Sequence, residues 1–177
     1  MRGIVLFLTV SQRGILLGVP NIQHLGLPMS DSETQDPFMR VTGEEPEMAQ
    51  VVFVEPTDEE SLRPLAVVLE VVGEEMLVAM AHPDIHLAGH LDIVVAPSDT
   101  LRYSIAVFTH VVAWVPRCRV AMTAGSVPDS IVEMTHSARG GVEPPVAMQG
   151  FPLADPVMEP RWASIQNLVQ EWRAGMA

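Results

Sequence analysis

Short, closely spaced β-prone runs in the middle of the chain most constrain how it can fold. Six of them fall at residues 51–54, 65–72, 76–81, 91–95, 103–115 and 117–121. The second and third runs are separated only by a short link that contains Gly73, which predicts a β-hairpin. Pro116 ends the long fifth run, and the sixth run is expected to pair back onto it. Strands of this length and spacing favour a small barrel or sandwich over alternating strand–helix units.

Two helices are expected after these strands. Ser126 to Asp129 combines a capping serine, an early proline and an acid near the helix start, and an apolar face then continues toward Arg139. Gly140 and Gly141 end this helix, and five prolines follow within residues 142–160. Pro160 opens a last, amphipathic helix. The fold expected from these patterns is mainly β, with one packed helix and a C-terminal amphipathic helix.

Charge is concentrated in one segment and divides the chain. The formal net charge is -12, and residues 31–60 alone hold ten acidic residues against one arginine. Such a stretch is typical of a solvated linker. We therefore divide the chain into an N-terminal extension with an acidic linker (1–47), a strand-rich domain with its following helix (48–140), and a proline-rich linker with the last helix (141–177).

Composition excludes several classes of protein. The single cysteine, Cys118, cannot form an internal disulfide framework or a cysteine zinc site. No apolar run approaches the roughly 18 residues that a membrane-spanning helix needs, and the apolar run at 4–10 lacks a signal cleavage site, so we expect a cytoplasmic protein without membrane contact. No dinucleotide fingerprint, phosphate loop or Gly-x-Ser-x-Gly occurs, and no cofactor is expected.

The order of the strand motifs resembles the MazF/PemK family of toxin endoribonucleases over residues 48–139. In that family an opening strand leads to an Arg-Pro pair before an apolar strand, as Val51–Val54 here leads to Arg63-Pro64. A second apolar strand, a long strand ending in a basic turn, and a proline-started helix follow in the same order. The chain departs from the pattern at the family's first Gly-Asp pair, where Ala49-Gln50 stands, and at a hydroxyl residue that is replaced by His82.

This resemblance implies a small SH3-like barrel and an endoribonuclease. The implied protein is the toxin component of a toxin–antitoxin system, cleaves RNA without a metal, is a homodimer and has an antitoxin protein as its partner. The alternative is a non-catalytic barrel of the same ancestry that acts as a partner-binding or regulatory module.

The chemistry of RNA cleavage suggests candidate site residues. Metal-independent cleavage needs groups that transfer protons and a cation that stabilises the phosphorane. Arg63 matches the family's catalytic arginine and could bind phosphate oxygens, and the imidazole of His82 could transfer protons. Further candidates for substrate binding are Ser104, Thr109, Arg102, Arg117 and Arg119. The alternative is that Arg63 pairs with a nearby acid such as Glu60 and that His82 is a surface-loop histidine.

Two other patterns carry competing hypotheses. His82, His86 and His90 recur every four residues, and three imidazoles could bind zinc in a metal-dependent hydrolase. Pro83 and Gly89 disfavour the regular helix that would align them, so a polar loop is the alternative. In the last helix, an apolar stripe could pack on the domain or bind a partner: Trp162, Ile165, Val169 and Trp172. Trp114, in the long strand-like run, is expected in the core.

Overall fold

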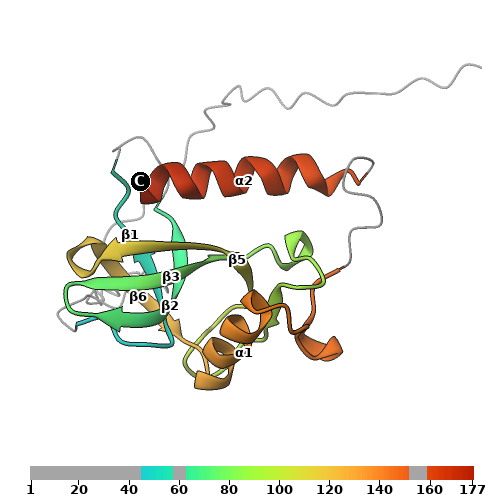
Figure 1. The fold of residues 1–177 in the computed structure, drawn as a ribbon, viewed down its shortest axis with the longest axis horizontal. Coiled ribbons are helices and arrows are strands. Elements are labelled where there is room, and N and C mark those ends of the chain that lie inside the picture. The colour runs from blue at the N-terminus through green and yellow to red at the C-terminus, as the bar shows by residue number, and fades with distance from the viewer. Residues whose placement is uncertain (1–44, 58–62, 152–158) are drawn as a thin grey trace, which may run out of the picture. The chain divides into compact units, whose positions relative to one another are not determined.

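Most of the predicted secondary structure falls in the part of the chain that the structure describes. This computed structural model describes residues 45–57, 63–151 and 159–177, all within one unit, Gln35–Ala177 (Figure 1). The predicted N-terminal extension therefore lies almost wholly outside the described residues. In the described part, no helix is long and apolar enough to cross a membrane.

Six antiparallel strands form one sheet in the order β4-β5-β3-β2-β1-β6. The strands are β1 (Gln50–Val54), β2 (Leu65–Val72), β3 (Glu75–His82), β4 (Ile93–Val95), β5 (Ile105–Pro116) and β6 (Val120–Ser126). Two α-helices follow: α1 (Asp129–Arg139) and α2 (Arg161–Met176). The mainly β class with two later helices is confirmed.

The β2–β3 hairpin forms where the sequence predicts it. Val72 pairs with Glu75 across the turn, and Gly73 adopts a φ of 58°, a conformation that glycine tolerates without a Cβ penalty. β5 extends the sheet beyond β3 and shifts register between its pairings with Ala79 and Met80. This irregularity falls next to Thr109, whose backbone N–H is instead bound by the carboxylate of Asp92 at 3.2 Å.

The end of β6 differs from the sequence prediction. The run 117–121 does not pair back onto β5, because Arg117–Arg119 form a 3₁₀ turn that redirects the chain to the far side of β1. Ser126 is the last residue of β6 instead of a helix cap, and α1 begins after Pro128 without a side-chain cap. The local sequence pattern predicted a strand here but not that it pairs with β1, because strand pairing over such a distance depends on tertiary packing.

A turn between β4 and β5 brings the two sheet edges near each other without closing the sheet. The backbone of Thr100 receives the Ser126 N–H at 3.3 Å, and its hydroxyl donates to the Ser126 carbonyl at 3.0 Å. Gly125, with a φ of 151°, permits this crossing because any Cβ there would collide with the Thr100 carbonyl. Among the described residues β4 and β6 share no ladder, so a closed barrel is not seen.

The two helices cover opposite faces of the sheet (Figure 1). Ile131 and Val132 of α1 pack on the face that carries Val51, Val67 and Ile105. Residues of α2 pack on the other face, which carries Val52, Val68, Met80 and Phe108 among others. Both faces are therefore apolar, which explains why β2 and β3 show near-continuous apolar runs instead of alternation.

Trp114 does not lie in the core, contrary to the prediction. Its side chain is 49% exposed near the end of β5, where it lies opposite Leu77. Val115, the next residue of β5, is fully buried in the apolar cluster under α2, and side chains alternate along a strand, so Trp114 lies on the other face of the sheet. An apolar strand residue is buried only where another layer covers it.

Arg119 fastens the end of α2 to the sheet. Its guanidinium donates to the carbonyls of Gly175 at 2.6 Å and Met176 at 3.0 Å, and twice to the carbonyl of Glu55. The last carbonyls of a helix lack intrahelical partners and carry partial negative charge, so a cation there is stabilising.

We expect Arg119→Ala to lower the free energy of unfolding by about 2 kcal/mol, because it leaves these carbonyls without their charged donor. The matched control is Arg117→Ala, which removes an ion pair with the exposed Glu45 and one donor to the Gly73 carbonyl and should cost only about 1 kcal/mol. Urea unfolding followed by circular dichroism measures both. Equal losses in the two variants would show that Arg119 does not fasten α2.

Candidate functional site

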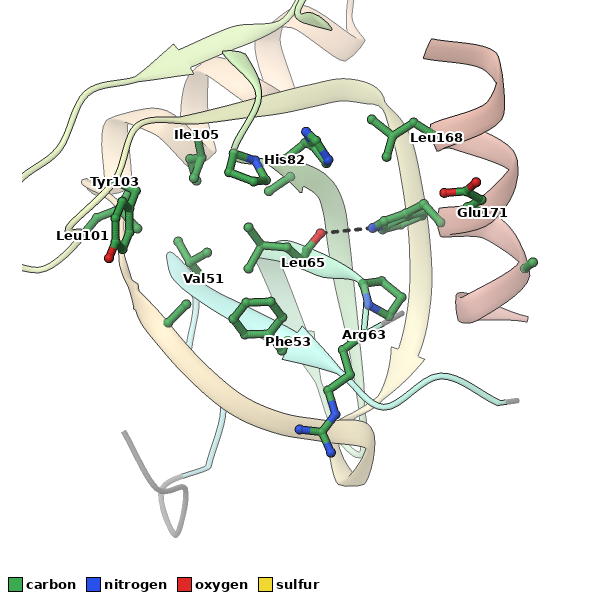
Figure 2. A pocket seen from close by; sticks show the side chains of 16 residues that line it. Val51, Phe53, Arg63, Leu65, His82, Leu101, Tyr103, Ile105, Leu168 and Glu171 are labelled. Atoms are coloured by element: carbon green, nitrogen blue, oxygen red, sulfur yellow. Dashed lines mark hydrogen bonds between the residues drawn. The ribbon is translucent and has the colours of Figure 1, made fainter. Parts of the chain in front are cut away.

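A pocket of about 650 Å³ lies between the open end of the curved sheet and the C-terminal half of α2 (Figure 2). Most of its lining is apolar, from β1, β5 and the approach to β2, and includes Val51, Phe53, Leu65, Leu101 and Ile105. Its polar lining groups come from four separate segments: Arg63, His82, Tyr103 and Glu171. Apolar cavities with a few convergent polar groups are typical of ligand sites. We call this the α2 pocket.

Arg63 stands at one end of the α2 pocket, directly before β2. Its guanidinium is 3.1 Å from the carboxylate of Glu55, and both side chains are about half exposed. The acid is thus Glu55; the predicted alternative, Glu60, lies outside the described residues. In Figure 2 the guanidinium points away from His82, so the two predicted catalytic groups line one pocket without contacting each other.

His82 ends β3 and lines the same pocket. Its Nδ1 accepts the backbone N–H of Asp84 at 3.0 Å, so the proton of the neutral ring lies on Nε2. Burial lowers the pKa of His82, and the nearby Asp84 carboxylate partly offsets this effect. The imidazole is therefore neutral at pH 7 and offers a hydrogen-bond donor.

The lowered pKa makes a pH-dependence prediction. In the unfolded chain this histidine binds a proton near pH 6.5, whereas in the folded chain it binds one only at lower pH. His82 therefore lowers the free energy of unfolding as the pH falls below about 6.5. We expect His82→Gln to weaken the fall in the free energy of unfolding between about pH 6.5 and 5. Urea titrations of both proteins at several pH values measure the difference. Parallel pH profiles would contradict the assignment.

Three of the predicted substrate-binding residues are not among those that line the α2 pocket. Thr109 is fully buried, and its hydroxyl donates to the Leu91 carbonyl at 3.1 Å, so it cannot reach a phosphate. Thr109 lies in the part of β5 where the register with β3 shifts. Arg102 is exposed and Ser104 half-buried, and both alternate with pocket residues on the approach to β5.

The two arginines of the basic turn are engaged elsewhere. Arg117 forms a 2.7 Å ion pair with Glu45 and donates to the Gly73 carbonyl. Arg119 holds the end of α2, as described above. Neither is among the pocket-lining residues, and both hold segments of the chain together in the structure.

The three spaced histidines do not converge. Asp84 caps a single 3₁₀ turn, Ile85–Leu87, so the segment is not the continuous helix that would align them. His86 stacks on Phe151 with ring centroids 5.9 Å apart. Within residues 45–57, 63–151 and 159–177, no three His, Cys, Asp or Glu side chains gather as metal ligands. The metal-dependent hydrolase is therefore not supported by the geometry.

The buried carboxylate of Asp92, near these histidines, accepts hydrogen bonds from the backbone. Asp92 accepts the backbone N–H groups of Gly89 at 2.8 Å and Thr109 at 3.2 Å. Burial raises the pKa of Asp92, and these two bonds, with the charges of His110 and His90, oppose the rise. The carboxylate thereby joins the loop before β4 to the irregular part of β5.

The predicted partner-binding stripe packs on the chain's own sheet. Trp172 is 5% exposed, and its indole N–H donates to the Leu65 carbonyl at 3.1 Å (Figure 2). Ile165 and Val169 pack against the same apolar cluster, and Trp162 is half-buried. Of the two outcomes that the sequence left open for this stripe, the structure shows packing on the domain.

Several lining residues of the α2 pocket were not found from the sequence. Glu171 and Leu168 lie more than a hundred residues after Arg63, and no local motif links them to it. Phe53 and Tyr103 appeared only as members of strand-like runs. The sequence pattern of an aromatic residue in a short strand predicts a core position. Only the three-dimensional structure shows that such a side chain lines a cavity.

Together these features define a mainly β domain with an apolar pocket bordered by the sheet and by α2. No protein-family description matches the chain, and no curated protein matches it by sequence. Among solved structures it is similar to an endoribonuclease in complex with its cognate antitoxin from Mycobacterial species, with 12% identity and a TM-score of 0.41. That similarity covers 55% of this chain and 92% of the other. At this TM-score the likeness is partial, and the proposed function rests on the chain's own residues.

Proposed function

We propose that this chain is a metal-independent endoribonuclease of MazF/PemK type whose active site is the α2 pocket. The observation that carries the proposal is that Arg63 and His82, two groups suited to phosphoryl chemistry, line one cavity although nineteen residues separate them. In this proposal the protein is a cytoplasmic toxin component, with RNA as its substrate and an antitoxin and a second copy of the chain as its partners.

Arg63 binds the scissile phosphate by exchanging Glu55 for a phosphate oxygen. The ion pair that it leaves is half exposed, and pairs of this kind contribute only about 0 to 1 kcal/mol, so the exchange costs little. A guanidinium can donate two parallel N–H bonds to phosphate oxygens and stabilise the charge of the phosphorane.

His82 presents its Nε2–H to the leaving 5′-oxygen. Because Nδ1 already accepts the Asp84 N–H, the neutral ring is held in the tautomer that donates from Nε2. A donor at this place stabilises the negative charge that develops as the P–O bond breaks. The 2′-hydroxyl oxygen is the nucleophile in this scheme. It loses its proton to water as it bonds to phosphorus, the P–O5′ bond breaks, and the leaving 5′-oxygen takes up a proton from water, so that a 2′,3′-cyclic phosphate and a 5′-hydroxyl are the first products.

The proposal is tested with purified protein and single-stranded RNA in the presence of EDTA. We expect cleavage that leaves a 2′,3′-cyclic phosphate on one fragment and a 5′-hydroxyl on the other. An oligonucleotide that is 2′-O-methylated throughout should stay intact, since it lacks the nucleophile. A folded protein that cleaves no RNA over a broad set of sequences would contradict the proposal.

We expect Glu55→Gln to raise the affinity for RNA by about 2- to 5-fold, because it frees Arg63 and removes a negative charge beside the phosphate. Glu45→Gln is the matched control, since it releases an exposed ion pair that does not involve the α2 pocket. Fluorescence anisotropy with the uncleavable 2′-O-methyl RNA measures both affinities. An equal gain in both variants would indicate a general charge effect instead.

A further inference from the structure

Glu171 places a carboxylate on the wall of a pocket that is otherwise largely apolar. It comes from α2, whereas the other polar groups come from the sheet and its loops (Figure 2). Among the described residues, the ion pairs are Arg63–Glu55, Arg117–Glu45 and Arg161–Glu159, so Glu171 has no cation partner there. Arg63, the arginine among the pocket-lining residues, forms its ion pair with Glu55.

This carboxylate restricts what can lie against it. The side chain of Glu171 is exposed, and a phosphate oxygen close to a carboxylate is repelled by it even where water screens the charges. The backbone of a bound polyanion is therefore favoured at the Arg63 end of the pocket, where the lining carries the positive charge. The part that reaches Glu171 must carry N–H donors, because an ionised carboxylate only accepts hydrogen bonds.

RNA offers such donors on its bases. A carboxylate can accept two parallel N–H bonds, and of the four bases only guanine presents two adjacent donors, N1–H and N2–H₂, on its Watson–Crick edge. Adenine, cytosine and uracil each place an acceptor beside their donor, which the carboxylate would repel. The cavity walls include the rings of Phe53 and Tyr103, and aromatic rings can stack on an unpaired base.

We propose that Glu171 is a specificity-determining residue that selects guanine at one position of the RNA bound in the α2 pocket. This inference rests on the proposed ribonuclease function and adds to it the base that the site recognises. Each good bidentate contact to a base contributes about 1–3 kcal/mol of discrimination, which corresponds to about 5- to 150-fold in kcat/KM.

The test compares RNA substrates that differ only at guanine. Each guanine of a cleaved oligonucleotide is replaced in turn by inosine, which lacks the N2 amino group and keeps the rest of the base. For the wild-type protein we expect one position at which inosine lowers kcat/KM by about 10-fold. In Glu171→Gln the guanine-to-inosine ratio at that position should fall to about 1 to 2, because the amide cannot accept both donors.

Glu133→Gln on α1 is the matched control, since it removes the same charge from an exposed site on the opposite face and should keep the wild-type ratio. A ratio in Glu171→Gln equal to that of the wild type, or equal rates for guanine and inosine at every position in the wild type, would overturn the role of Glu171 while leaving the ribonuclease intact. Absence of any cleavage by the wild type would overturn the proposed function itself.

Discussion

Arg63→Ala should lower kcat/KM for RNA cleavage by about 100-fold or more. Removing one preorganised donor from a developing oxyanion costs about 10²- to 10³-fold in known enzymes. Among the described lining residues of the α2 pocket, Arg63 is the one that carries a permanent positive charge. Arg63→Lys should retain part of the activity, since an ammonium supplies charge without the bidentate fork.

Arg139→Ala, at the exposed end of α1, is the control for Arg63→Ala because it changes net charge by the same amount away from the pocket. Thermal unfolding of both variants checks that the fold is retained, which we expect because the Arg63 ion pair is half exposed. Activity of Arg63→Ala within a few-fold of wild type would remove this arginine from the active site.

Trp172→Ala should lower the free energy of unfolding by about 3–5 kcal/mol, the usual cost of truncating a large buried aromatic. The side chain is 5% exposed, packs in the apolar cluster beneath α2 and donates to the Leu65 carbonyl. Its loss removes the main anchor of the helix and leaves a buried carbonyl without its donor. Chemical unfolding monitored by far-UV circular dichroism measures the change.

The matched control is Trp114→Ala, which truncates a 49% exposed indole and should change stability by less than about 1 kcal/mol. Analytical ultracentrifugation of Trp172→Ala measures its oligomeric state. It distinguishes packing of the apolar stripe on the chain's own sheet from binding of the stripe to a partner. A variant that keeps its stability but changes from dimer to monomer would show that the stripe binds a second chain instead of its own sheet.

Much of the sheet could be predicted because its local signals are strong. β2, β3 and β5 are continuous β-prone runs, and the turn at Gly73 needs little information beyond its own residues. The partner of β6 could not be predicted, since its register with β1 depends on packing over about seventy residues. The exposure of Trp114 likewise depends on the packing around the end of β5 and not on its local pattern.

The candidate site likewise contains residues that the sequence could predict and residues that it could not. Arg63 and His82 were predicted from the motifs that resemble a known family, and both line one pocket. The full burial of Thr109 and its hydrogen bond to the Leu91 carbonyl could not be predicted, because both depend on tertiary packing. Glu171 was missed because α2 approaches the pocket only through tertiary contacts, which the Arg119 and Trp172 hydrogen bonds maintain. The periodicity of the sequence predicted α2 and its apolar stripe. It could not show that the C-terminal half of α2 would line the α2 pocket.

The central claim is that RNA binds in the α2 pocket, and mapping the bound RNA on the protein by two-dimensional NMR tests it most directly. Titration with an uncleavable 2′-O-methyl RNA should shift the backbone amides of the lining residues of the pocket that carry an N–H, among them Val51, Phe53, Arg63, Leu65, His82, Leu101, Tyr103 and Glu171. The amides of α1 and of the end of β5 around Trp114 should stay unchanged. Shifts centred on α1 or Trp114, or no shifts at saturating RNA, would contradict the account.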